Sequence, residues 1–131
     1  MGQRNTLTTE QEMEFEQLKQ YLLDKPHTTL EFPFGDDVYG FKVKGKMFAL
    51  IGFRGDEMNM NLKCDPDEGE SLREVFPDIT AGYHMDKRHW ITIYFRGGVP
   101  DGEVCRLIDN SFRLVVAKMT KKDQASILVN L

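Results

Sequence analysis

The stretch GYHMDKRHW, residues 82–90, contains two histidines, an aspartate, two basic residues and the only tryptophan of the chain. Imidazole and carboxylate groups are ligands for divalent metals, so His84, Asp86 and His89 form a candidate metal site. On a strand the first two share one face and His89 faces the other way, so the site needs a turn between them. The adjacent cations would repel a metal, and no fourth ligand stands at a familiar spacing. We therefore expect a tight corner without metal, in which the imidazoles bond backbone carbonyl groups.

This corner is expected to be anchored by Trp90 and Met85 pointing inward. A metal or small-molecule site at His84 and His89 remains an alternative, although a less favoured one.

Cys64 is the strongest candidate nucleophile, because it precedes a helix-start pattern and a helix N-terminus lowers the pKa of a thiol. The neighbouring Asp65 acts in the opposite direction, and the chain has no G-x-S-x-G, Walker or GxGxxG motif. Cys64 and Cys105 lack the spacing of a zinc ribbon or a disulfide framework. We expect two reduced thiols, no cofactor and no enzymatic activity.

The formal net charge of -4 and the pI near 5.4 argue against a protein that coats nucleic acid by bulk attraction. The charges are nevertheless segregated along the chain. Residues 38–63 carry five basic and two acidic side chains, whereas residues 64–80 carry six acidic and one basic. A local basic surface could therefore meet a polyanion.

Basic side chains on two strand units could contact the phosphates of duplex DNA, weakly and in a salt-dependent way. The candidates are Lys42, Lys44, Lys46, Lys87, Arg88 and Arg96. The alternative is a solvated strand face whose lysines block edge-to-edge aggregation. No helix presents Arg, Asn or Gln at a spacing that reads bases, so sequence-specific recognition is not expected.

Several aromatic side chains could stack on unpaired bases or on a protein partner, although most of them are expected to pack in the core. They are Phe34, Tyr39, Phe53, Trp90 and Tyr94. An acidic helix opposite a basic sheet also suits selective protein docking. A protein-interaction module without enzymatic activity is therefore the alternative function.

Helical patterns stand at four places in the chain. Residues 8–25 repeat apolar residues at helical spacing and end before a proline. Asp65 and Pro66 begin a second helix that runs to about residue 76. Residues 99–119 form a long amphipathic pattern, and Thr120 caps a short C-terminal helix.

Strand patterns lie mainly between the first two helices. Residues 39–43 and 47–53 form a hairpin around KGK, and residues 58–63 alternate apolar and polar side chains. The second of these strands is apolar throughout, which indicates a central strand covered on each side. Residues 28–37 are expected to form a loop or an edge segment, and residues 89–95 a further strand. The elements predict one α+β domain across residues 1–131.

The blocks NLKCDP, GYHMDKRHW and LIDNSFRLVV resemble the MmcQ/YjbR family of small bacterial proteins, in the order that the family has them. The resemblance covers about residues 8–122, which it marks as the core of the domain. This resemblance implies a CyaY-like antiparallel sheet of about five strands with helices packed on it, in the order α-β-β-β-α-β-β-α-α. It also implies DNA binding through a double wing of hairpins. The chain differs from the family pattern at Ala81, Asp86 and Ile91, where proline, asparagine and asparagine are common.

No apolar run approaches the ~20 residues that span a membrane, and no secretory signal pattern is present. We expect a cytoplasmic monomer whose partner is double-stranded DNA or another protein.

Overall fold

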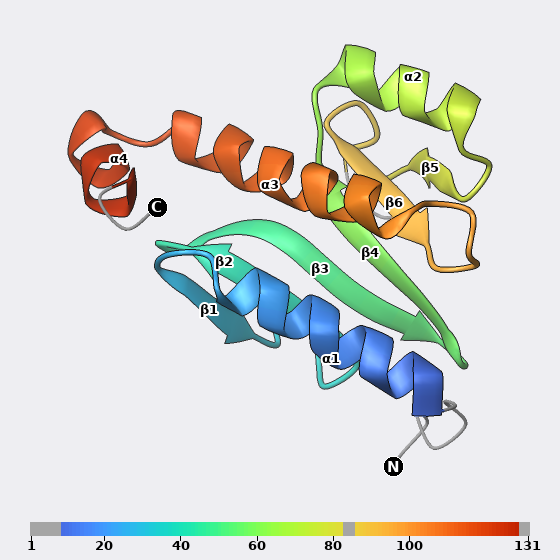
Figure 1. Cartoon of the computed structure of the whole chain (residues 1–131). Helices are drawn as coiled ribbons and strands as arrows, with labels where there is room; N and C mark the ends of the chain where they lie inside the picture. The colour runs from blue at the N-terminus through green and yellow to red at the C-terminus, as the bar shows by residue number, and fades with distance from the viewer. Residues whose placement is uncertain (1–8, 83–85, 129–131) are drawn as a thin grey trace.

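The computed structural model describes residues 9–82 and 86–128 of the chain. Its helices are α1 (Thr9–Leu23), α2 (Pro66–Val75), α3 (Asp101–Ala117) and α4 (Lys121–Leu128). Its strands are β1 (Thr28–Glu31), β2 (Val38–Val43), β3 (Lys46–Arg54), β4 (Glu57–Lys63), β5 (Ile79–Ala81) and β6 (Trp90–Tyr94). The expected α+β class is confirmed, and Figure 1 shows these elements as one open sheet with helices packed on it.

The sheet has the strand order β1-β2-β3-β4-β6-β5, and every neighbouring pair is antiparallel. It therefore has one strand more than expected. The additional strand is β1, which pairs with β2 from Thr28 opposite Val43 to Glu31 opposite Gly40. It is an edge strand and ends before Pro33, so the missing N–H of proline removes no hydrogen bond from the ladder.

The helices α1, α2 and α3 pack on one face of the sheet (Figure 1). On that face Ile51, Met60 and Ile93 lie in register on neighbouring strands and are completely buried. The other face shows the alternate residues of the same strands, among them Asn59 and Asn61, which are only partly buried. Among the described residues, no helix covers this second face.

The sequence predicted that β3 is apolar throughout because both of its faces are covered. In the structure a β-bulge accounts for part of this apolar run. The register shifts between Phe41, which pairs with Ala49, and Lys42, which pairs with Met47, so Phe48 is an extra residue. Phe48 packs edge to face on Phe112 of α3, with 5.2 Å between ring centroids. One β-bulge thus directs an additional large side chain into the helix-covered core.

The predicted start signals of two helices are confirmed. Asp65 accepts a hydrogen bond from the backbone N–H of Asp67 at 3.0 Å, and Pro66 is the first residue of α2. Thr120 Oγ1 accepts from the backbone N–H of Asp123 at 3.1 Å at the start of α4. These caps satisfy backbone donors that have no partner inside the helix.

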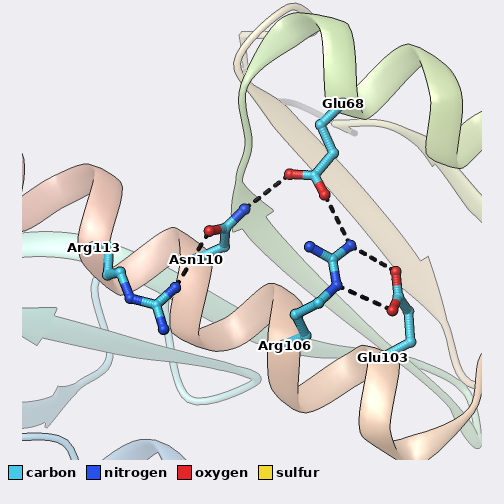
Figure 2. Close-up of polar contacts among 5 residues, drawn as sticks. All are labelled: Glu68, Glu103, Arg106, Asn110 and Arg113. Carbon is cyan, nitrogen blue, oxygen red and sulfur yellow. Dashed lines mark hydrogen bonds and ion pairs between the residues drawn. The ribbon is translucent and has the colours of Figure 1, made fainter.

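Helix α2 is tied to α3 by a cluster of polar side chains that Figure 2 shows. Arg106 lies between two carboxylates, at 2.8 Å from Glu68 and 2.7 Å from Glu103. Asn110 donates a second hydrogen bond to Glu68 at 2.8 Å. The hydrogen bonds from Arg106 hold the pKa of Glu103 below its ordinary value. This cluster fixes the position of α3, which carries residues of the candidate site.

Replacing Arg106 by alanine is expected to lower the free energy of unfolding by about 1 kcal/mol at pH 7, the upper end for a partly exposed ion pair. Because the folded-state pKa of Glu103 is lowered, its stabilisation is present above the ordinary value of 4.5 and is lost as the pH falls through the lower folded value. Urea unfolding at pH 7 and pH 3 measures both effects. Lys122→Ala, at an exposed position of α4 outside this cluster, is the control, and an equal loss at both pH values would contradict the assignment.

Within the part of the chain that the structure describes, no helix is both long enough and apolar enough to span a bilayer.

Candidate nucleic-acid interface

The three hairpin lysines that the sequence singled out lie around the turn between β2 and β3. Lys44 and Gly45 form this turn with φ of 47° and 81°, as a tight two-residue hairpin requires. Lys42 forms an ion pair with Glu31 of β1 at 3.0 Å, and Lys44 lies 3.8 Å from Asp123 of α4. The hydrogen bond from Lys42 holds the pKa of Glu31 below its usual range. Lys42 is therefore neutralised, Lys44 is weakly paired, and Lys46 is exposed.

Beside this hairpin the strands β3 and β4 separate, because a side chain of α3 stands between them. Their last pair at this end is Ala49 with Leu62. Beyond it, the completely buried Ser111 accepts a hydrogen bond from the backbone N–H of Lys63 at 2.9 Å. The same hydroxyl donates to the carbonyl of Phe48 at 2.6 Å. Ser111 thus replaces the direct link between the strands and holds them apart.

The separated strand ends and the C-terminal part of α3 enclose a hollow of about 480 Å³, which we call the lysine hollow. It is lined by Lys44, Lys46, Met47, Lys63, Val115, Lys118, Met119, Thr120 and Asp123. Four lysines thus line it against a single carboxylate. Within residues 9–82 and 86–128, no ion pair engages Lys46, Lys63 or Lys118. Such a surface attracts an anion.

Sequence reasoning did not select Lys63 or Lys118 for this site. Lys63 ends the alternating pattern of β4, and its proximity to the hairpin follows from sheet register. Lys118 is the C-cap of α3, and only the crossing of α3 over β3 and β4 brings it to the hairpin (Figure 1). The single local signal for Lys118 was its place among the basic residues late in the long amphipathic pattern of residues 99–119.

The loop before β6 makes the turn that the sequence predicted. Asp86 Oδ1 accepts from the backbone N–H of Arg88 at 2.9 Å, and Oδ2 lies 3.0 Å from His89 Nδ1. The hydrogen bond from the backbone of Arg88, followed in importance by the contact with His89, holds the pKa of the Asp86 carboxyl below its ordinary value. His89 therefore bonds a carboxylate rather than the expected carbonyl. An asparagine at position 86 could accept the same backbone bond without adding a charge.

Five of the six candidate cations lie at one end of the sheet, and Arg96 lies at the other. Trp90 pairs with Lys63, which places the exposed Lys87 and Arg88 at the same end as the hairpin lysines. Arg96 follows the far end of β6 and forms a two-pronged ion pair with Glu57, where the second contact is 3.1 Å. The hydrogen bond from Arg96 lowers the pKa of Glu57. Arg96 therefore does not join the other five.

The expected inward position of Trp90 is not found. Trp90 is partly exposed, and it alternates with Ile91 so that it lies on the face without helices. Met85 and His84 lie outside the described residues. Among the described residues, no group of three His, Cys, Asp or Glu side chains is arranged to hold a metal ion.

Cys64 is unsuited to act as a nucleophile. It is 3% exposed, and burial, together with the charges of Glu68 and Asp65, raises the pKa of its thiol to about 11. The thiolate is the reactive form, so Cys64 is protonated at neutral pH.

Comparisons with known proteins identify the family and the fold of the chain. A family model described as YjbR matches residues 23–114. The YbdF protein of Escherichia coli O157:H7, described as uncharacterized, is 36% identical over 83% of the chain and 89% of its own length. The YjbR protein of Escherichia coli K12, also described as uncharacterized, is 28% identical over 91% of the chain and 100% of its own length.

Two solved structures share the fold. The crystal structure of the Deinococcus radiodurans protein DR2400, a DUF419 domain, superimposes with a TM-score of 0.80 and 34% identity over 86% of each chain. A crystal structure from Pseudomonas syringae gives a TM-score of 0.65 and 31% identity, over 76% of this chain and 96% of its own.

Proposed function

The chain belongs to the YjbR family, and we propose that it is a non-enzymatic DNA-binding protein that contacts the phosphate backbone with the lysine hollow. The observation that carries this proposal is the arrangement of Lys46, Lys63 and Lys118. All three line one hollow, and the structure pairs none of them with a carboxylate of the described residues. On a chain with a net charge of -4, these lysines form a local basic surface that a polyanion can approach.

The β2–β3 hairpin and the β5–β6 loop supply the two wings of the proposed contact. Lys44 and Lys46 belong to the first wing, and Lys87 and Arg88 to the second. Lys63 at the end of β4 lies between them in the sheet. Arg96 takes no part, since it lies at the opposite end of the sheet and is bound by Glu57. Lys42 is held by Glu31 and adds little.

The proposed binding is insensitive to base sequence. Lysine ammonium groups act as point charges on phosphate oxygens and carry no base information. Acidic side chains at the start of α2, which follows Lys63 directly, limit how closely a duplex approaches between the wings. Contact with the phosphates of one backbone is therefore favoured over insertion into a groove.

Fluorescence anisotropy with a labelled 20-base-pair duplex, between 20 and 200 mM NaCl, tests this function. If four of the cations in the hollow and the second wing each neutralise one phosphate, the plot of log affinity against log salt has a slope of about -3.6. Two duplexes of unrelated sequence should give the same slope and affinities within about threefold of one another. Absence of binding at 20 mM NaCl would end the proposal, and a slope near zero would exclude phosphate contact as its basis.

A further inference from the structure

The face of the sheet without helices has a hollow of about 460 Å³, which we call the sheet hollow. It is lined by Phe34, Asp37, Val38, Leu50, Gly52, Phe53, Arg54, Asn59, Asn61 and Tyr94. Helices α1 and α3 pack on the opposite face (Figure 1). The sheet hollow and the lysine hollow have no lining residue in common, so they are separate sites.

The shape of the sheet hollow follows from two glycines. Gly52 lies between the sheet partners Val38 and Asn59 and offers no side chain, so the centre of β3 is open. At Gly40 the chain after β1 lies so close that a Cβ atom would come within 2.9 Å of Pro33. This close approach brings the next residue, Phe34, to the border of the hollow. A side chain at Gly52 would fill space that the hollow needs, and one at Gly40 would push Pro33 and the residues after it away.

Aromatic rings border the sheet hollow. Phe34 is 66% exposed, and Tyr94 of β6 is partly exposed. The guanidinium of Arg96 lies over the Tyr94 ring, 4.6 Å from its centroid, and restricts the motion of that ring. The apolar floor is supplied by Leu50, which is 4% exposed. These surfaces suit the faces of a planar ligand.

Hydrogen-bonding groups that the fold does not use also line the sheet hollow. Asn61 Oδ1 accepts the hydroxyl hydrogen of Thr92 at 2.6 Å, which leaves its amide nitrogen as a donor. The side-chain amide of Asn59 forms no hydrogen bond with the described residues, and neither does the carboxylate of Asp37. An aliphatic ligand would remove water from these groups without replacing the hydrogen bonds that the water made, so it would bind unfavourably.

We propose that the sheet hollow binds a nucleobase, that is, a planar nitrogen heterocycle with adjacent hydrogen-bond donors and acceptors. Asn59 can donate and accept at once, and it stands beside the Asn61 donor on β4. The volume lies within the range of about 300–1,000 Å³ that small-molecule sites occupy. The base can come from a free nucleoside or from an unpaired position of a single strand. This inference stands independently of the proposed duplex contact, because it uses none of its lysines.

Titration of the isotope-labelled full chain with the four uncharged ribonucleosides, followed by NMR, tests the inference. At least one nucleoside should cause saturable shifts of the side-chain amide signals of Asn59 and Asn61. A second arm uses a ten-nucleotide single strand at 0.5 M NaCl, where phosphate contacts are screened. Binding of the strand alone identifies an unpaired base of a polymer as the source, and nucleoside binding identifies the free form. Either result supports the site.

Two variants locate the binding. Gly52→Val fills the hollow, and Asn59→Ala removes the unpartnered amide; each should weaken binding at least tenfold. A Cβ atom at Gly52 meets only Asn59 Oδ1, at 3.5 Å, so the fold has room for the change. Gly102→Ala, where a Cβ atom meets nothing within 4 Å, is the control and should leave the affinity unchanged. The inference is overturned if no probe shifts the two amide signals, or if binding persists undiminished in both variants.

Discussion

Replacing Ser111 by alanine is expected to lower the free energy of unfolding by about 1 to 3 kcal/mol. The hydroxyl accepts from the backbone N–H of Lys63 and donates to the carbonyl of Phe48, and it is completely buried. Alanine leaves both backbone groups without a partner at a place where β3 and β4 no longer pair with each other. A buried polar group that loses its partner costs more than a hydrogen bond gains.

Urea unfolding followed by circular dichroism measures this loss. Ser71→Ala is the matched control, because it is the same substitution at an exposed position of helix α2. That control should change the stability by less than about 0.5 kcal/mol. If the two variants are equally stable, the strands do not depend on the hydroxyl of Ser111. Since this hydroxyl also holds the walls of the lysine hollow apart, the alanine variant should bind DNA more weakly while still folded.

The double variant Lys46→Gln, Lys118→Gln is expected to bind duplex DNA roughly 100-fold more weakly at 50 mM salt than the unaltered chain. Each phosphate contact contributes about 0.9 to the slope of log affinity against log salt, which amounts to about tenfold in affinity at that concentration. Both lysines line the hollow, and neither is paired with a carboxylate in the described parts of the chain. Their removal therefore takes away attraction without releasing a buried charge.

The slope itself provides the sharper measurement, since it should become less negative by about 1.8 in the double variant. The control is Lys19→Gln with Arg73→Gln, on α1 and α2, which changes the net charge by the same amount. That control should keep the slope unchanged. If both double variants lose affinity equally, the attraction comes from total charge, and the lysine hollow has no special part in it.

The sequence by itself determined the elements whose signals are local. Asp65 and Pro66 predicted the start of α2, because a cap and a proline act within one helical turn. The alternation of Met58, Met60 and Leu62 predicted β4, because successive side chains of a strand face opposite ways. The family blocks indicated the overall order of elements, and the YjbR match confirms the family. The cap, the proline and the alternation are each complete within a few residues of chain, whereas the order of the elements followed from blocks spread along it.

Tertiary structure decided what depends on partners distant in the sequence. The segment 28–31 has no strand pattern strong enough to predict β1, and its pairing with β2 supplies the missing stability. Sheet register places Arg96 beside Glu57 and Lys63 beside Trp90. It therefore separates Arg96 from the other five cations that the sequence suggested as one binding surface. Ser111 and Lys118 reach the hairpin only because α3 crosses the sheet. Local backbone geometry sets the period of a pattern, whereas the neighbours of each side chain follow from packing between distant segments, which no short stretch of sequence encodes.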